Sequence, residues 1–296
     1  MSGVALAVLD LPFPFDREYM QLALGAAVVV GVCAPLIGVF LVQKQMALMG
    51  DGVGHLAFAG VAAGLLLDVW PLWSALAVAV LGALAIDRLQ RRGRATGDLA
   101  LAIVFYGGIA LGVVLVSRSG AGSLSVVEYL FGSILTVGPD DLALVAGLGV
   151  VIVATLALFG RPLLATVLDA EAARVAGLPV DTSNALLSVL TAVTVVASMR
   201  VVGVLLVAAL MVLPVASSRL LAHSFRTTLI FAVLVGAGSA VVGLGAARVW
   251  GLAPGGTIVL TATACFGVVA VLTSRRPDAR PWRRSPAPQQ TGRTDG

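Results

Sequence analysis

Residues 20–42 read Met20-Gln-Leu-Ala-Leu-Gly-Ala-Ala-Val-Val-Val-Gly-Val-Cys-Ala-Pro-Leu-Ile-Gly-Val-Phe-Leu-Val42, a stretch without a charged side chain. About 20 mainly apolar residues are enough for a helix to cross a bilayer, so this stretch predicts a membrane-spanning helix. The whole chain is similarly apolar, because 59% of its 296 residues are hydrophobic and 11% are charged. A water-soluble domain cannot bury that much apolar surface in its core. The composition therefore excludes an ordinary soluble enzyme.

Further apolar stretches along the chain predict an all-α fold, a polytopic transmembrane helical bundle of eight or nine spans. The count stays open because the segments at 52–67 and 71–86 are short. The predicted spans cover residues 20–42, 52–67, 71–86, 99–116, 142–159, 184–199, 201–216, 229–247 and 257–273.

The basic residues indicate the orientation of these spans. With nine spans, 15 of the 19 Lys and Arg residues fall on one side of the membrane and four on the other. Basic residues concentrate in cytoplasmic loops, so we expect a multi-pass protein of the cell membrane with its N-terminus outside and its C-terminus in the cytoplasm. Residues 1–273 form the predicted transmembrane domain. The Arg- and Pro-rich residues 274–296 are predicted to be a disordered cytoplasmic tail.

The chain has one lysine, Lys44, which lies in the sequence Val-Gln-Lys-Gln-Met. A Walker-type nucleotide loop needs a Gly-rich turn that ends in lysine, so the sequence predicts no ATP site of this kind. No zinc-protease motif or nucleophile with an obvious base is present either. We therefore do not expect the chain to be an enzyme.

The most informative polar residues are Asp51 and His55, in Met46-Ala-Leu-Met-Gly-Asp-Gly-Val-Gly-His55. A spacing of four residues places both side chains on one face of a helix. A carboxylate and an imidazole suit a borderline divalent ion such as Zn²⁺ or Mn²⁺. Two ligands are too few for a closed site, so the pair suits a relay or a site completed by a second copy. The alternative is that Asp51 is only a helix N-cap.

A second motif is Asp169-Ala-Glu-Ala-Ala-Arg-Val-Ala-Gly177. It predicts a short cytoplasmic helix in which Asp169 is the cap, Glu171 lies in the first turn and Gly177 ends the helix. This helix suits the groove of a partner protein, or it is a plain connection between two spans.

Four stretches resemble the permease subunits of zinc/manganese/iron-type ABC importers. The Gly-Asp-x-x-x-His order is the most specific part of this resemblance, and the Glu-Ala-Ala-x-x-x-Gly piece is similar to the loop that docks the ATPase. The matching stretches are residues 35–42 together with 46–55, then 129–142, 171–177 and 201–216.

The resemblance implies that Asp51 and His55 belong to the path of a transported divalent metal, with zinc favoured and manganese or iron(II) as alternatives. It also implies an ATPase-coupling loop formed by Asp169, Glu171, Ala172, Ala173 and Gly177. The expected partners are cytoplasmic ABC ATPase subunits, an extracytoplasmic metal-binding protein, a second permease copy and membrane lipid. No permanently bound cofactor and no nucleic acid are expected.

The alternatives to this interpretation are two other classes of transporter. A permease for siderophores or other metal chelates would not need Asp51 and His55. A self-sufficient secondary metal transporter would need an internal repeat and coupling carboxylates near the middle of the membrane. The sequence has no clear repeat, and acidic residues are nearly absent from the predicted spans.

Overall fold

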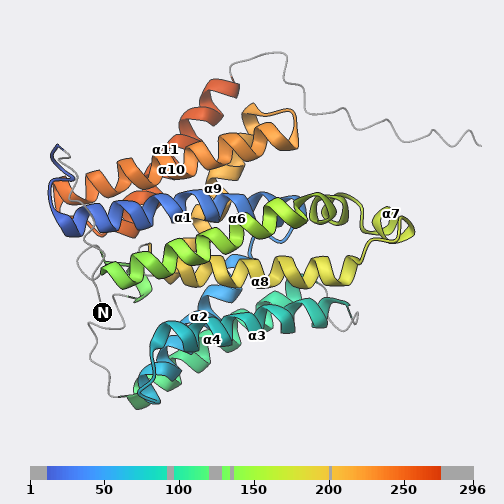
Figure 1. Ribbon diagram of the computed structural model, residues 1–296, viewed down its shortest axis with the longest axis horizontal. Coiled ribbons are helices and arrows are strands. Elements are labelled where there is room, and N and C mark those ends of the chain that lie inside the picture. The colour runs from blue at the N-terminus through green and yellow to red at the C-terminus, as the bar shows by residue number, and fades with distance from the viewer. Residues whose placement is uncertain (1–11, 92–96, 120–128, 134–136, 200–201, 275–296) are drawn as a thin grey trace, which may run out of the picture.

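The computed structural model describes residues 12–91, 97–119, 129–133, 137–199 and 202–274, and within these ranges the chain is helical with no strand (Figure 1). The predicted tail at 274–296 therefore falls, apart from its first residue, outside the described residues. The helices are α1 (Glu18–Gln43), α2 (Met49–Leu66), α3 (Pro71–Arg91), α4 (Gly97–Ser119), α6 (Pro139–Leu168), α7 (Ala170–Val175), α8 (Val180–Met199), α9 (Val204–Leu221), α10 (Phe225–Trp250) and α11 (Pro254–Ser274).

Eight of the described helices are long and apolar enough to cross a membrane, which confirms the predicted fold class. The two short predicted segments, 52–67 and 71–86, correspond to α2 and α3, and both are among the eight. The segment predicted at 201–216 is shifted, because α9 begins at Val204. Its apolar part, Leu206–Leu221, is shorter than the others and measures about 24 Å at 1.5 Å per residue.

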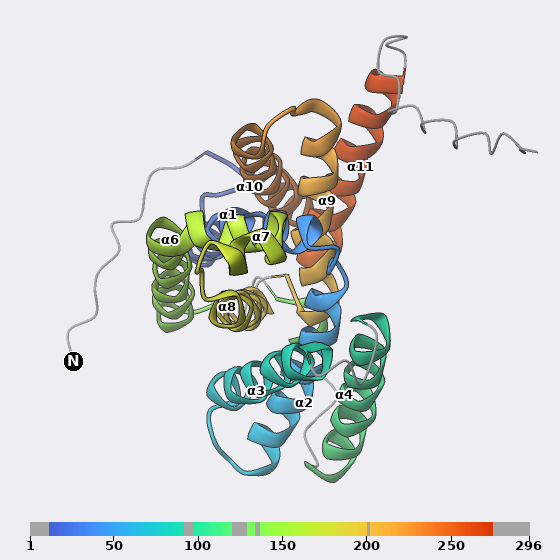
Figure 2. The ribbon, with the colours of Figure 1, turned by 90° about the vertical axis from the view of Figure 1, so that its right-hand side faces the viewer.

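The helices form three groups, which keep the same order in two perpendicular views (Figures 1 and 2). Helices α2, α3 and α4 contact one another at one side of the molecule, and α10 packs against α11 at the other. Between them, α1 contacts α6, α8, α9 and α10, and α3 connects the first group to α8. The molecule is therefore a central layer flanked by a three-helix group and a two-helix group.

The bundle has two ends, and each is marked by a cavity. Gln43 of α1, Leu168 of α6 and His223, which follows α9, line a cavity of about 360 Å³ at one end, here called the α7 end. Tyr19 of α1 and Pro254 of α11 line a cavity of about 520 Å³ at the opposite end. Because α9 begins near this second cavity, where Val202 contacts Gly255, and ends beside the first, it connects the same two ends as the longer helices.

Glycines let α2 approach both of its neighbours. A Cβ atom added at Gly60 would lie 2.6 Å from Cα of Ala75 in α3. One added at Gly112 of α4 would lie 2.7 Å from the Phe58 ring of α2. Real Cβ atoms do not approach other atoms so closely, so Gly60 requires glycine against the α3 backbone, and a side chain at Gly112 would have to displace the Phe58 ring. Small residues of this kind are what lets two membrane helices approach closely.

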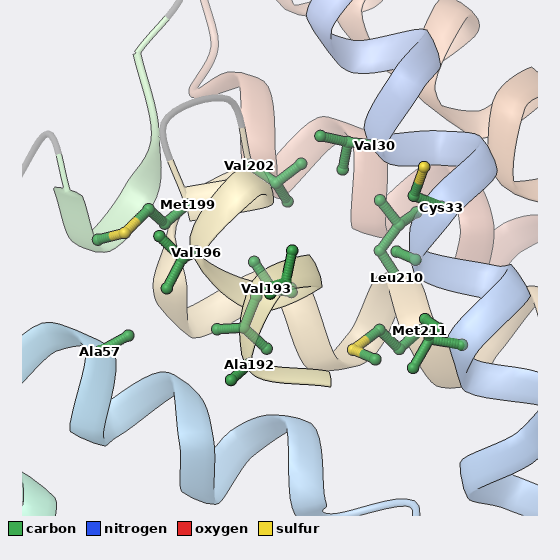
Figure 3. Packing of buried hydrophobic residues seen from close by; sticks show 14 of the residues in the cluster. Val30, Cys33, Ala57, Ala192, Val193, Val196, Met199, Val202, Leu210 and Met211 are labelled. Atoms are coloured by element: carbon green, nitrogen blue, oxygen red, sulfur yellow. The ribbon is translucent and has the colours of Figure 1, made fainter. Parts of the chain in front are cut away.

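Buried aliphatic side chains from α1, α8 and α9 meet at the centre of the molecule (Figure 3). Val193 and Val196 of α8 and Leu210 and Met211 of α9 belong to this cluster, and Ala57 of α2 lies at its lower left in this view. Polar side chains of α8 in this region are satisfied within the helix: the Thr191 hydroxyl, for example, donates to the Leu187 carbonyl oxygen at 2.8 Å. The core therefore fixes the position of α2 through one of its buried faces.

Candidate functional site

The candidate site begins in the first turn of α2. The helix starts at Met49, so Asp51 is its third residue, and Leu48 occupies the N-cap position with no side-chain cap. The interpretation of Asp51 as the N-cap is therefore wrong. Asp51 and His55 are both partly buried, and their spacing of four residues places them on one face of this helix.

The Asp51 and His55 side chains face α4. Asp51 lines a cavity of about 260 Å³ together with Leu101, Phe105 and Tyr106 of α4. The His55 ring meets the Phe105 ring edge-on, with 4.5 Å between the ring centroids and 80° between the ring planes. Phe105 thus contacts the histidine and also lines the cavity of the aspartate. No motif in the sequence pointed to it.

Close backbone contacts hold this part of α2 from two sides. A Cβ atom added at Gly108 of α4 would lie 3.1 Å from the backbone nitrogen of Leu56. On the side of α9, a Cβ atom added at Gly54 would lie 3.4 Å from the Val204 carbonyl oxygen. The absence of a side chain at Gly54 therefore admits α9 to this turn of α2. Helices α4 and α9 therefore both pack closely against the turn of α2 that lies between Asp51 and His55.

The donor set at this site is one carboxylate and one imidazole from the chain. No group of three or more His, Cys, Asp or Glu side chains that could hold a metal ion occurs among the described residues. Such a pair can bind a divalent ion weakly, with water or a second protein copy supplying the remaining ligands. The other histidine, His223, is exposed and lines the separate cavity at the α7 end.

The second candidate element, α7, projects beyond the ends of α1 and α8 (Figure 1). The Asp169 carboxylate caps it by accepting hydrogen bonds from the backbone N–H groups of Glu171 at 3.0 Å and Ala172 at 2.9 Å. At its other end, Gly177 has φ +80°, and the Leu178 N–H donates to the Ala173 carbonyl oxygen. The predicted cap and the predicted stop of this helix are both confirmed.

Most of the α7 surface is open to solvent. Ala173 is the buried residue of the helix, and it faces the body of the protein. Val175 is 91% exposed, and Glu171 and Ala172 are exposed as well. The solvent-exposed surface of α7 therefore includes an apolar side chain at the end of a capped helix.

The fold and these two features define a class of protein: a multi-pass helical membrane protein with a polar pair between two helices and an exposed helix at one end. More particularly, the chain belongs to the ABC 3 transport family, whose sequence model matches residues 16–273.

Named relatives agree with this family assignment. The manganese transport system membrane protein MntC of Halalkalibacterium halodurans is 33% identical over 263 residues, which is 88% of this chain and 90% of the relative. The high-affinity zinc uptake system membrane protein ZnuB of Haemophilus influenzae is 31% identical over 250 residues, covering 84% and 95%.

Among solved structures, PsaBC from Streptococcus pneumoniae in complex with Fab matches with a TM-score of 0.78 and 31% identity, covering 86% of this chain and 91% of that one. A metal-chelate type ABC transporter in an inward-facing conformation shares the fold at 20% identity with a TM-score of 0.64.

Proposed function

We propose that this chain is the permease subunit through which an ABC importer moves a divalent transition-metal ion, Mn²⁺ or Zn²⁺, into the cytoplasm. Membership of the ABC 3 transport family supports the general class. The metal is inferred from the relatives, one named for manganese transport and one for zinc uptake. The sequence favours zinc, but the relatives include proteins named for manganese transport and for zinc uptake, so they support either ion.

The observation that carries the proposal is the pair Asp51 and His55 beside a cavity between α2 and α4. Ionisable groups inside a membrane protein are costly unless they are paired or hydrated, so where they occur they mark functional sites. A carboxylate oxygen and an imidazole nitrogen bind Mn²⁺ and Zn²⁺ without the rigidity of a closed four-ligand site. A cargo ion must leave as readily as it enters, and an incomplete donor set meets that requirement. The remaining ligands would come from water or from Asp51 and His55 of a second copy.

Energy for transport is assigned to a separate ATPase subunit that docks at α7. Capping by Asp169 and the turn at Gly177 fix this helix, and the exposed Glu171, Ala172 and Val175 present its surface. Ala173 anchors the helix to the body from the opposite face. In this proposal the α7 end faces the cytoplasm, the N-terminus is outside and the C-terminus is inside, in agreement with the distribution of basic residues.

The complete importer in this proposal contains two copies of the permease, its ATPase subunits and an extracytoplasmic metal-binding protein. Residues 1–273 supply the membrane pathway, and no transport role is assigned to 274–296. Metal released outside would meet Asp51 and His55 while the pathway is open to that side. Closure of the ATPase subunits on ATP, transmitted through α7, would open the pathway inward.

Metal uptake by the complete importer in proteoliposomes tests this proposal. Asp51→Ala and His55→Ala should each lower uptake of radioactive Mn²⁺ or Zn²⁺ by roughly 10- to 100-fold, the scale by which disturbed metal sites lose affinity. Capture of the ATPase subunit should be unchanged in both. His223→Ala and Asp140→Ala are matched controls, because each removes the same type of side chain at an exposed position.

The same assay separates the alternatives. Full metal uptake by both site variants would contradict the role of the pair. Uptake that requires a chelator would indicate a chelate permease, and uptake without ATP would indicate a secondary transporter.

A further inference from the structure

Lys44, the one lysine of the chain, lies in the turn between α1 and α2 and is not exposed. Its Nζ donates a hydrogen bond of 2.8 Å to Oδ1 of Asn184 in the first turns of α8. This contact joins two segments that are 140 residues apart in the sequence. A hydrogen bond from a charged donor is shorter and stronger than one between neutral groups, so it is a firm connection between the α1–α2 turn and α8.

A second polar contact holds the same end of α8. Arg91, the last residue of α3, forms an ion pair with the Asp181 carboxylate, with 3.1 Å between the two side-chain atoms. It also donates to the Asp181 backbone oxygen and pairs with Asp87, whose side chain is 7% exposed. Asp181 and Asn184 are three residues apart and therefore lie on neighbouring positions of one helix face. The start of α8 is thus tied to α3 and to the α1–α2 turn.

The surroundings of Lys44 make separation from Asn184 costly. Burial lowers the pKa of Lys44 below the usual lysine value, the nearby Asp87 carboxylate opposes that change, and the Arg91 cation adds to it. If α8 moved without the turn, the ammonium group would lose its hydrogen-bond partner in a poorly hydrated place beside another cation. The α1–α2 turn and the start of α8 are therefore expected to move together.

These contacts lie between the two candidate functional elements. On one side, α7 ends at Val175 and α8 begins at Val180. On the other side, α2 begins at Met49 and carries Asp51 in its first turn. The chain is continuous from the exposed helix to Asn184, and continuous again from Lys44 to the polar pair. The Lys44–Asn184 hydrogen bond connects these two pieces at the end of the bundle where both begin, in addition to the packing of α8 against α1 and α2.

We propose that the Lys44–Asn184 contact is a positioning relay, which transmits displacement of α7 and α8 to the first turn of α2 and so couples the ATPase to the metal site. This inference rests on the proposed docking of the ATPase at α7. Lys44 and Asn184 act through α2 and are not ligands of the metal. The Arg91–Asp181 ion pair holds the start of α8 against the end of α3 during this displacement.

The experiment uses the complete importer and a readout that is independent of metal transport. A cysteine reporter replaces Leu48, which is 64% exposed and lines the Asp51 cavity, in a chain whose Cys33 and Cys265 are replaced by alanine. The rate of maleimide labelling is measured without nucleotide and with ATP trapped on the ATPase. Lys44→Met and Asn184→Leu keep the size of each side chain but remove the hydrogen bond.

In the reporter chain, labelling should differ between the two nucleotide states. Each variant should reduce that difference by about 10-fold, within the usual range of coupling between sites. The double variant should lose no more than either single one, because both substitutions remove the same contact. Lys44→Arg should retain the response and shows that the turn still folds with a cation. Arg88→Gln, which removes an exposed positive charge one turn before Arg91, should leave it unchanged.

Two outcomes would overturn the relay: a nucleotide response that survives in both Lys44→Met and Asn184→Leu, or additive losses in the double variant. Failure of the proposed cargo is distinguishable from either. If neither Mn²⁺ nor Zn²⁺ is taken up, yet labelling still depends on nucleotide through Lys44 and Asn184, the proposed function is wrong and the relay is supported.

Discussion

At the scale of single residues, Phe105 contacts the His55 ring, and we expect it to fix the orientation of the imidazole. Its ring meets the imidazole edge-on at 4.5 Å, and such aromatic pairs contribute about 0.5–1.5 kcal/mol beyond burial. Phe105→Ala should therefore raise the metal concentration for half-maximal uptake by roughly 2- to 10-fold, at about tenfold per 1.4 kcal/mol. Concentration series of Mn²⁺ and Zn²⁺ uptake measure this.

Two further substitutions make that measurement specific to the ring. Phe105→Tyr keeps an aromatic edge toward His55 and should restore the half-maximal concentration. Ile103→Ala, at an exposed position of the same helix, should have no effect. An unchanged half-maximal concentration in Phe105→Ala would show that the ring does not orient the histidine.

The sequence allowed the Asp51–His55 pair to be predicted but not its surroundings. A spacing of four residues specifies a shared face as soon as the segment is helical, and Asp51 and His55 do lie on one helix. Phe105 reaches His55 only because Gly108 lets α4 approach α2, and nothing in the sequence pairs these two segments. Asp is also a favoured N-cap, so the sequence alone does not distinguish an Asp51 that caps the helix from one that lies inside it.

At the scale of elements, α7 depends on its two caps. A helix of six residues has little stability of its own. The Asp169 carboxylate accepts from two backbone N–H groups, and loss of such a cap costs about 1 kcal/mol. Gly177, at φ +80°, reaches a conformation that costs a side-chain-bearing residue about 1–2 kcal/mol. Asp169→Ala and Gly177→Ala should both increase amide hydrogen exchange across 170–175 and weaken capture of the ATPase.

A substitution on the exposed surface of α7 distinguishes unfolding of this helix from loss of its contact with the ATPase. Val175→Ala leaves both caps in place, so exchange across α7 should stay slow while ATPase capture falls. If capture is unaffected by all three substitutions, α7 is only a connection between α6 and α8.

Helix ends were predictable where the chain carries a physical stop signal. Asp169 and Gly177 are such signals, and both ends of α7 follow them. The span predicted at 142–159 is shorter than α6, which runs to Leu168 and contains Pro162. Proline removes one backbone hydrogen bond and usually ends or bends a helix, but α6 continues for a further six residues. In this last part of α6 the Thr166 hydroxyl donates to the Pro162 carbonyl oxygen at 2.9 Å.

At the scale of the whole molecule, composition and charge predicted the all-helical class and the number of apolar helices, but not which helices touch. In a membrane, lipid tails are as apolar as leucine side chains, so apolar faces do not identify their partners. The separation of α2, α3 and α4 from the α10 and α11 pair (Figure 2) follows instead from shape, where glycines admit a neighbouring backbone.

The path of α9 decides the topology of the complete chain. Its apolar part is about 24 Å long at 1.5 Å per residue, yet it begins near Gly255 and ends beside the cavity that Gln43, Leu168 and His223 share. If α9 crosses the membrane, His223 lies on the same side as Val175, and the orientation inferred from basic residues is consistent. If it does not cross, His223 lies on the opposite side from Val175. Cysteine reporters at these two exposed positions therefore distinguish eight crossings from nine.

We expect His223→Cys and Val175→Cys to react with a membrane-impermeant maleimide only in inside-out vesicles, in a chain whose Cys33 and Cys265 are replaced by alanine. Trp250→Cys, at the exposed end of α10, should react only in intact cells, because α10 returns the chain to the end marked by Tyr19 and Pro254. Val175 and His223 reacting from opposite sides would remove α9 from the spans. Reaction of both from outside would invert the orientation and place α7 out of reach of a cytoplasmic ATPase.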